Sequence, residues 1–175
     1  MDAPEKKIIV PTRKWIFRGR EKSPVDSKRR TCIPAVIRQG MEDFPRRWTL
    51  LLWDRGGAEP PFLKMFPVET AMQLYQCCTK AKFDANQDLL RRSLANSVDV
   101  DVDSLWRLTL PKELAEKAKI SMEVFYVSAI DYVELWNPGL FEWRERLDNA
   151  KLAAALDSLS LSGDAESLSD DDKRQ

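Results

Sequence analysis

Apolar and polar residues alternate most regularly over residues 98–103, where three valines separate three aspartates. Successive side chains of a strand point to opposite faces, so the valines are predicted to face a core and the aspartates the solvent. The alternation resumes at Arg107 after three intervening residues. The pattern therefore predicts a β-hairpin whose three-residue loop places Asp103 opposite Arg107.

The same pattern occurs 77 positions earlier. Val25, Asp26, Ser27, Arg30 and Pro34 match Val102, Asp103, Ser104, Arg107 and Pro111. Each proline is predicted to begin a helix, because proline suits the first helical position. In each half an apolar strand then follows, at residues 48–53 and 123–128, and a shorter strand comes next, at residues 62–66 and 132–136.

Three more helices are predicted beyond the hairpins. Two begin near Pro67 and Pro138, the second with Asn137 as its N-cap, and a third follows Asp84. In the helix after Pro138, apolar residues recur at helical spacing and form one stripe: Leu140, Trp143, Leu147, Ala150 and Ala154.

These elements indicate an α+β fold made of one domain, residues 15–157. Its first repeat covers about 15–80 and its second about 96–157. Neither repeat has enough strands to bury its apolar face alone, so the two are predicted to pack about a pseudo-two-fold axis. Residues 1–14 are predicted to be a basic extended arm. Residues 158–175, rich in Ser and Asp, are predicted to be a disordered acidic tail.

The apolar content changes the picture of assembly. Hydrophobic residues make up 43% of the 175. Apolar residues such as Trp15, Phe17 and Trp106 exceed what one small domain should bury, which predicts a homo-oligomer larger than a dimer. No apolar run approaches the roughly 20 residues of a membrane span, and the N-terminus lacks a signal-peptide pattern, so we expect a cytoplasmic protein.

The residue types argue against several kinds of site. The chain has no His and three Cys, of which Cys77 and Cys78 are adjacent. Catalytic triads with His and His-based metal sites are therefore excluded, and a zinc site is disfavoured. Residues 99–103 could imitate an acidic metal cluster, but an exposed polar strand face explains them. We expect no enzyme activity, metal, cofactor or small-molecule substrate.

The formal net charge of zero hides an uneven distribution. Residues 1–47 hold 13 Lys and Arg against 6 Asp and Glu, residues 48–150 hold 12 against 16, and residues 151–175 hold 3 against 6. The basic first segment suggests an anionic partner. A solvated basic face is the alternative, and charge alone does not decide between them.

The paired aspartate and arginine permit two interpretations. As a cross-strand ion pair they would contribute roughly 0.2–1 kcal/mol to a hairpin and need no ligand. The same contact would also aim the guanidinium at a phosphate or a guanine. The cations around the first hairpin are Arg18, Arg20, Lys22, Lys28, Arg29 and Arg30. Around Arg107 lie Leu105, Trp106 and acids, so the first hairpin is predicted to do most of any nucleic-acid binding.

Residues 17–38 and 98–143 resemble the two repeats of the MraZ family of bacterial transcriptional regulators, within the SpoVT/AbrB-like superfamily. The resemblance covers about residues 15–150. It implies two tandem motifs that complete one small β-barrel with flanking helices, and subunits that assemble into a ring. It also implies binding to DNA direct repeats upstream of a division and cell-wall gene cluster, at the nucleoid. Arg30 and Arg107 match the family's DNA-contacting arginine, and Asp26 and Asp103 match its paired aspartates.

One departure from the family bears on both hairpins. Glycine usually precedes the arginine, whereas this chain has Arg29 and Trp106. Because a side chain disfavours positive φ, both turns are expected to change geometry and Arg107 to contribute less. The alternative function is therefore a ring-forming interaction protein that has lost specific DNA binding.

Overall fold

The computed structural model describes residues 17–41, 45–57, 59–80, 85–129 and 131–166. The predicted basic arm, residues 1–14, lies outside them. The strands are β1 (Arg20–Pro24), β2 (Arg30–Cys32), β3 (Arg47–Trp53), β4 (Phe62–Pro67), β5 (Ser97–Asp101), β6 (Arg107–Thr109), β7 (Glu123–Ser128) and β8 (Val133–Trp136). The helices are α1 (Ala35–Arg38), α2 (Val68–Lys80), α3 (Ala85–Ala95), α4 (Lys112–Lys117) and α5 (Pro138–Glu166). This α+β composition confirms the predicted fold class.

The strands of the described residues do not close into the expected β-barrel. Six of them form an antiparallel sheet in the order β1-β7-β8-β4-β3-β5, and β2 and β6 form a separate two-stranded ribbon. The physical reason is that β2 forms its ladder with β6, while its backbone bridge to the β1 arm joins Val25 and Thr31, outside the six-stranded sheet. The six-stranded sheet therefore keeps β1 and β5 as edges.

The two repeats are interleaved through their strands. Four pairings join one repeat to the other: β1 with β7, β3 with β5, β4 with β8, and β2 with β6. In the ribbon, Thr31 lies opposite Leu108, its equivalent in the second repeat. A pseudo-two-fold axis therefore passes between these two residues.

One apolar core lies between the sheet, the ribbon and the short helices. Leu50, Leu63, Val124 and Leu135 are fully buried on the sheet, and Ile33 is fully buried after the ribbon. Phe17, which we expected to be exposed, is only 2% exposed and lies with its ring centroid 5.9 Å from that of Trp48. Phe17 therefore provides no surface for assembly.

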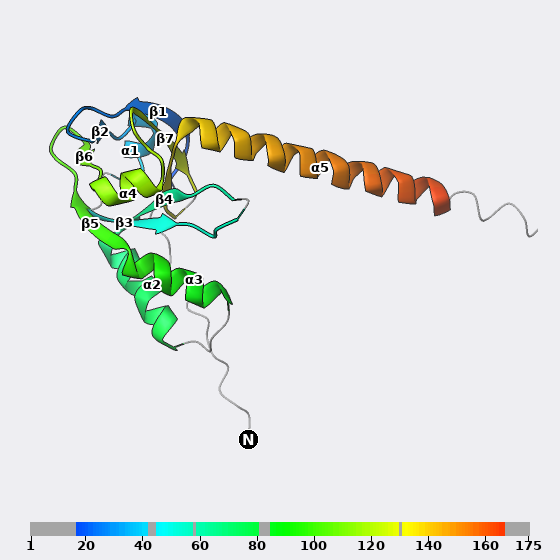
Figure 1. Ribbon diagram of the computed structural model, residues 1–175, viewed down its shortest axis with the longest axis horizontal. Coiled ribbons are helices and arrows are strands. Elements are labelled where there is room, and N and C mark those ends of the chain that lie inside the picture. The colour runs from blue at the N-terminus through cyan, green and yellow to red at the C-terminus, as the bar shows by residue number, and fades with distance from the viewer. Residues whose placement is uncertain (1–16, 42–44, 58, 81–84, 130, 167–175) are drawn as a thin grey trace, which may run out of the picture.

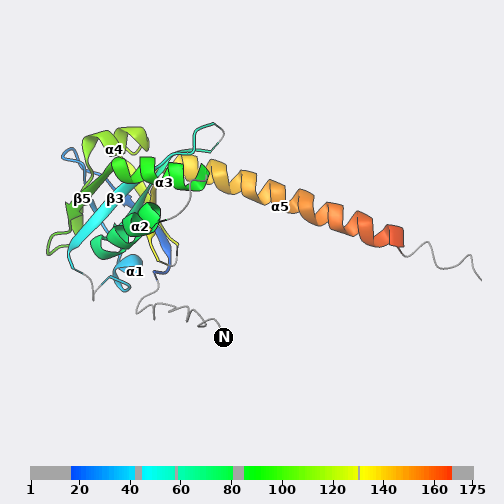
Figure 2. The same cartoon turned by 90° about the horizontal axis from the view of Figure 1, so that it is seen from below.

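The remaining helices differ in how they meet this body. Helices α2 and α3 pack together against β3 and β4 (Figures 1 and 2) and bury Ala71 and Leu94 with Leu51 and Phe66. Helix α5 begins on the body, where Phe141 is buried, and then projects away from it (Figure 1). It continues past residue 158, where the acidic tail was predicted to begin, to Glu166.

Candidate functional site

In the first hairpin, one carboxylate organises the whole turn. Asp26 Oδ1 accepts hydrogen bonds from the backbone N–H groups of Lys28 and Arg30, both at 2.8 Å. Its Oδ2 accepts one from Arg30 Nε at 2.7 Å. Arg30 N–H is thus held by the same carboxylate that holds its guanidinium. The side chain therefore has one preferred direction.

The second hairpin reproduces this arrangement almost atom for atom. Asp103 Oδ1 accepts from the N–H groups of Leu105 and Arg107, both at 2.9 Å, and Oδ2 accepts from Arg107 Nε at 2.8 Å. Leu105 stands where Lys28 stands in the first copy. The local geometry therefore depends on the aspartate and the arginine, and hardly on the loop residues between them.

Hydrogen bonding stabilises the charged form of both aspartates. The backbone N–H of Arg30 is the main cause that lowers the pKa of Asp26, and that of Arg107 does the same for Asp103. A carboxyl group whose pKa is lowered by folding stabilises the fold at pH values above its ordinary pKa of 3.8, and that contribution is lost as the pH falls below it. Both aspartates therefore stay charged, and keep their arginines in place, at neutral pH.

The expected change in turn geometry did not occur. Arg29 and Trp106, which stand where the family usually has glycine, have φ values of 60° and 61°. Each adopts the left-handed conformation despite its side chain, and each carbonyl is engaged across the repeats. Leu110 N–H donates to Arg29 O at 2.8 Å, and Ile33 N–H donates to Trp106 O at 2.8 Å. Because this bond exists in both copies, the surrounding structure enforces the turn.

The two arginines lie on one surface. In the ribbon, Arg30 is opposite Thr109 and Arg107 is opposite Cys32, so the arginines are diagonal neighbours. Between them Thr31 and Leu108 are buried, which places the arginines on the outer side of the ribbon. Both arginines line one hollow of about 230 Å³. We name this surface, Arg30 and Arg107 with Asp26 and Asp103, the arginine face.

The second hairpin has a cation that the sequence did not indicate. The guanidinium of Arg46 lies over the indole of Trp106, 4.2 Å from its ring centroid. Arg46 Nη1 also donates a hydrogen bond to Asp103 O at 2.7 Å. Arg46 thus gives the second hairpin a positive charge, which its own loop residues Leu105 and Trp106 do not provide. No sequence pattern joins residue 46 to residue 106, so only the fold reveals it.

Each hairpin tip has a cation and an exposed apolar side chain. In the first hairpin the loop supplies the cation and a neighbouring segment the apolar residue, and in the second hairpin the reverse holds. Lys28 and Arg29 are exposed cations at the first tip, where the neighbouring Met122 is 81% exposed and its carbonyl accepts from Val25 N–H at 2.8 Å. At the second tip Leu105 is 61% exposed, and the cation is Arg46. Each tip therefore combines positive charge with an exposed apolar side chain.

The other predicted cations lie elsewhere. Arg20 forms an ion pair with Glu145, and Lys22 Nζ lies 3.1 Å from Glu142 Oε1, so both are held by α5. Arg18 is exposed just before β1. The fold therefore divides the predicted basic set: Lys28, Arg29 and Arg30 stay near the arginine face, while Arg20 and Lys22 fasten α5 to the edge strand.

The acids of β5 are partly neutralised. Asp99 Oδ1 accepts a hydrogen bond from Thr49 Oγ1 at 2.8 Å, and its Oδ2 lies 3.6 Å from Arg47 Nη2. Asp101 faces Arg47 in the strand register. Arg47 therefore partly offsets the negative charge of the acids near Arg107.

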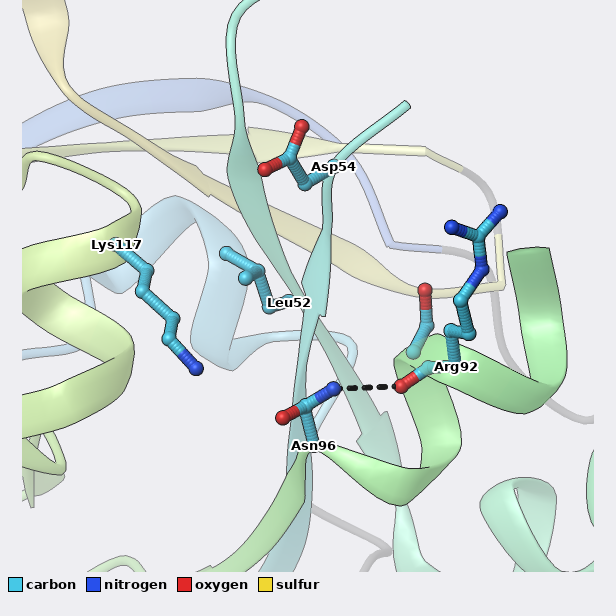
Figure 3. Close-up of a pocket in the computed structure, with 6 residues that line it drawn as sticks. Leu52, Asp54, Arg92, Asn96 and Lys117 are labelled. Carbon is cyan, nitrogen blue, oxygen red and sulfur yellow. Dashed lines mark hydrogen bonds between the residues drawn. The ribbon is translucent and has the colours of Figure 1, made fainter. Parts of the chain in front are cut away.

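Another cavity, of about 310 Å³, lies between α3, α4 and β3 (Figure 3). Its two cations are already paired: Arg92 with Asp88 at 3.1 Å and Lys117 with Glu113 at 2.8 Å. The amide of Asn96 donates to Arg92 O. We therefore place the candidate site at the arginine face. Across the described residues there is no cluster of three metal-ligating side chains, and no described helix is long and apolar enough to cross a membrane.

Comparison with known proteins gives a consistent result. Residues 94–159, which include the second hairpin and the start of α5, match the family model "MraZ protein, putative antitoxin-like". A protein of Ruegeria pomeroyi named "Transcriptional regulator MraZ" is 30% identical over 141 residues, covering 74% of this chain and 81% of the relative. Proteins of the same name from a Ruegeria species and from Flavobacterium psychrophilum are 27% and 25% identical. Those alignments cover 80% and 71% of this chain and 88% and 78% of the relatives.

Proposed function

The chain belongs to the MraZ family, and on that premise we propose that it is a DNA-binding transcriptional regulator whose arginine face contacts the duplex. The observation that carries the proposal is the matched pair of Asp–Arg contacts on the outer side of one two-stranded ribbon. A two-stranded β-ribbon fits into the major groove of B-DNA. The names of the relatives support regulation of transcription as the role.

Preorganisation of the two arginines favours their binding to DNA. An arginine guanidinium is planar and can bind a guanine edge or a phosphate through two parallel hydrogen bonds. Here the aspartates already order both side chains, and their half-exposed guanidinium groups remain open to solvent. Binding therefore costs less side-chain entropy than it would for a free arginine.

The cations at the tips are assigned to the DNA backbone. Lys28 and Arg29 are exposed next to Arg30 at the first tip, where Arg29 Nε donates to Leu110 O at 3.2 Å, and Arg46 lies at the second tip. Phosphate contacts position a protein without reading sequence, whereas contacts to base edges give specificity. We therefore assign the base contacts to Arg30 and Arg107.

We extend the proposal to the wider role that the resemblance to the family implies. Target sites would be direct repeats upstream of a division and cell-wall gene cluster, and the protein would act at the nucleoid in the cytoplasm. Self-association into a ring would present the arginine face repeatedly, so sites would recur about every 10 base pairs, one turn of DNA. The role is regulation and needs no cofactor.

The alternative, an interaction protein without specific DNA binding, loses its main support. It depended on altered turns at Arg29 and Trp106, and both residues adopt the positive φ that glycine would provide. Both Asp–Arg contacts are also intact. The alternative remains as an outcome of the following experiment.

The experiment compares variants in gel shifts with the DNA upstream of the protein's own gene. Arg30→Ala and Arg107→Ala should each weaken specific binding by about tenfold or more, since a bidentate base contact contributes roughly 1–3 kcal/mol. Arg46→Ala and Lys28→Ala should weaken binding to all sequences alike and lower the salt dependence by about one unit each.

Arg92→Ala is the matched control, because Arg92 is an exposed arginine paired with an aspartate outside the arginine face. It should bind DNA like the unmodified protein. If the unmodified protein and Arg30→Ala bind every DNA equally at low salt, the interaction-protein alternative replaces the proposal.

A further inference from the structure

The base of α5 carries a partly exposed apolar stripe. Trp143 is 41% exposed and Leu147 is 37% exposed, and Ala150 and Ala154 continue the line at exposed positions. The spacing of three and four residues keeps all of them on one side of the helix. A helix that projects into solvent with such a stripe lacks the packing that normally stabilises it.

The stripe leads into a cavity. A hollow of about 500 Å³ lies where α5 leaves the body, between its first turns, the end of α4 and the loop from β3 to β4. Its apolar lining includes Pro60, Pro61, Leu140 and Trp143, and its charged lining includes Lys119, Arg146 and Glu59. We name the stripe and this hollow together the α5 groove.

The charges of the α5 groove are unbalanced. The acids at the base of α5 are all used in ion pairs, Glu142 and Glu145 with β1 and Asp148 with Arg144. Glu59 lies 3.7 Å from Arg55. Within the described ranges, no carboxylate lies within ion-pair distance of Lys119, Arg146 or Lys151.

The cations that lack a carboxylate partner lie along the stripe, and Arg146 Nε donates to Glu142 O at 3.2 Å. At 3.6 residues per turn, Arg146 and Lys151 lie on opposite sides of the stripe, and Lys119 lines the hollow at its base. The α5 groove therefore suits a segment that is both apolar and acidic. A second α5 laid alongside through the same stripe would bring these cations against one another, which disfavours it.

The chain itself contains a segment of this chemistry. Residues 158–175 hold Leu159, Leu161 and Leu168 together with Asp164, Glu166, Asp170, Asp171 and Asp172. We infer that the α5 groove of one molecule binds the acidic tail, residues 158–175, of a second copy. The inference gives the proposed self-association one specific contact, and it does not require DNA binding.

The acidic residues 170–172 of a molecule are too far along the chain from its own α5 groove to bind there. From Trp143 to Glu166, where α5 ends, the helix rises about 35 Å at 1.5 Å per residue. The three aspartates follow within six residues, which span at most about 21 Å even when extended. The aspartates therefore cannot return to Trp143 or the hollow of their own chain, whereas those of a neighbour can.

The first test measures binding of the tail as a peptide. A fluorescein-labelled peptide of residues 158–175 is titrated with the full chain, and its anisotropy is recorded. Saturable binding is expected, weakened at least about tenfold by Arg146→Glu, since a charge contact is replaced by repulsion. Arg146 is exposed on α5, so the change leaves the fold intact. Lys112→Glu, the same charge change at an exposed position on α4 outside the α5 groove, should have no effect.

Charge exchange and cross-linking complete the test. A peptide with Asp170, Asp171 and Asp172 replaced by Lys should bind Arg146→Glu better than it binds the unmodified chain. With benzoylphenylalanine in place of Leu168 in the full chain, irradiation should give a covalent dimer whose cross-link maps to the α5 groove.

Three results would overturn the inference: no saturable peptide binding, peptide binding that Arg146→Glu leaves unchanged, or a cross-link within one chain. A fourth is that Arg146→Glu weakens DNA binding and not peptide binding, which would assign the cations to nucleic acid. Failure of the proposed function is separate, because Arg30→Ala would then leave DNA binding unchanged while the peptide still binds.

Discussion

Arg29 and Trp106 show how two unlike residues fill the same strained backbone position. Both have φ near 60°, but Arg29 is exposed and Trp106 is half-buried against the core. Both residues therefore have the same backbone strain, but their side chains make different contacts. Substitution by glycine separates the two contributions.

We predict that Arg29→Gly changes the free energy of unfolding by less than about 1 kcal/mol, because relief of left-handed strain opposes two losses: the hydrogen bond from Arg29 Nε to Leu110 O at 3.2 Å, and the entropy that glycine adds to the unfolded chain. Trp106→Gly carries the same backbone terms but also loses the packed indole and its contact with Arg46. It should lower the free energy of unfolding by about 2–3 kcal/mol. Urea unfolding of both variants measures the difference. Equal effects would mean that the Trp106 side chain contributes no packing.

At the scale of elements, the start of α5 depends on one side chain. Asn137 Oδ1 accepts a hydrogen bond from Leu140 N–H at 3.1 Å, as predicted for an N-cap, and its Nδ2 donates to Lys119 O at 2.7 Å. Lys119 lies two residues past the end of α4 and has a φ of 56°. Asn137 therefore joins the end of one helix to the beginning of the next.

Asn137→Ala should lower the free energy of unfolding by about 1–2 kcal/mol, since a cap and one further hydrogen bond are lost. Asn149→Ala is the matched control, because Asn149 is exposed within α5. It should be neutral within about 0.5 kcal/mol, since alanine suits a helix interior. Thermal unfolding followed by circular dichroism reports both. A cost for Asn149→Ala as large as that for Asn137→Ala would count against capping.

Individual elements were predictable where the signal is local. The hairpins, the strands at residues 48–53 and 123–128 and the helices after the prolines all lie close to their predicted positions. Val98 is an exception: it was predicted to be buried and is 42% exposed, because it lies near the start of the edge strand β5. Alternation predicts which face a residue lies on, and the rest of the fold decides whether that face is covered.

At the scale of the whole molecule, pairing between repeats could not be read from the sequence. The pattern around Asp26 and Arg30 identifies a hairpin, but nothing in it says that β2 pairs with β6 and not with β1. The contact of Arg46 with Trp106 likewise depends on two segments that meet only in the folded chain. The Asp–Arg contact within each hairpin was therefore predictable, whereas the pairing that brings both hairpins into one ribbon and the contact of Arg46 with Trp106 were not.

The interleaved repeats predict that neither half folds alone. Each half supplies strands whose hydrogen-bonding partners lie in the other, at four pairings. If the chain is divided between residues 82 and 83, each fragment should lack a cooperative thermal transition, because long-range pairing provides the sheet. Mixing the fragments should restore the transition in circular dichroism. A fragment that melts cooperatively by itself would show that one repeat is an independent domain.

The pseudo-two-fold axis between Thr31 and Leu108 has a consequence for evolution. A symmetric homodimer presents two identical DNA-binding surfaces, and its preferred DNA site is therefore palindromic. Any mutation changes both surfaces at once. Here the two hairpins that we propose to contact DNA are encoded separately in one polypeptide, consistent with duplication and fusion of an ancestral gene. The two repeats can therefore mutate independently: the first has Lys28 where the second has Leu105 at the equivalent position. Such a chain can prefer a DNA site whose two halves differ in sequence. It would then bind that site in one orientation only.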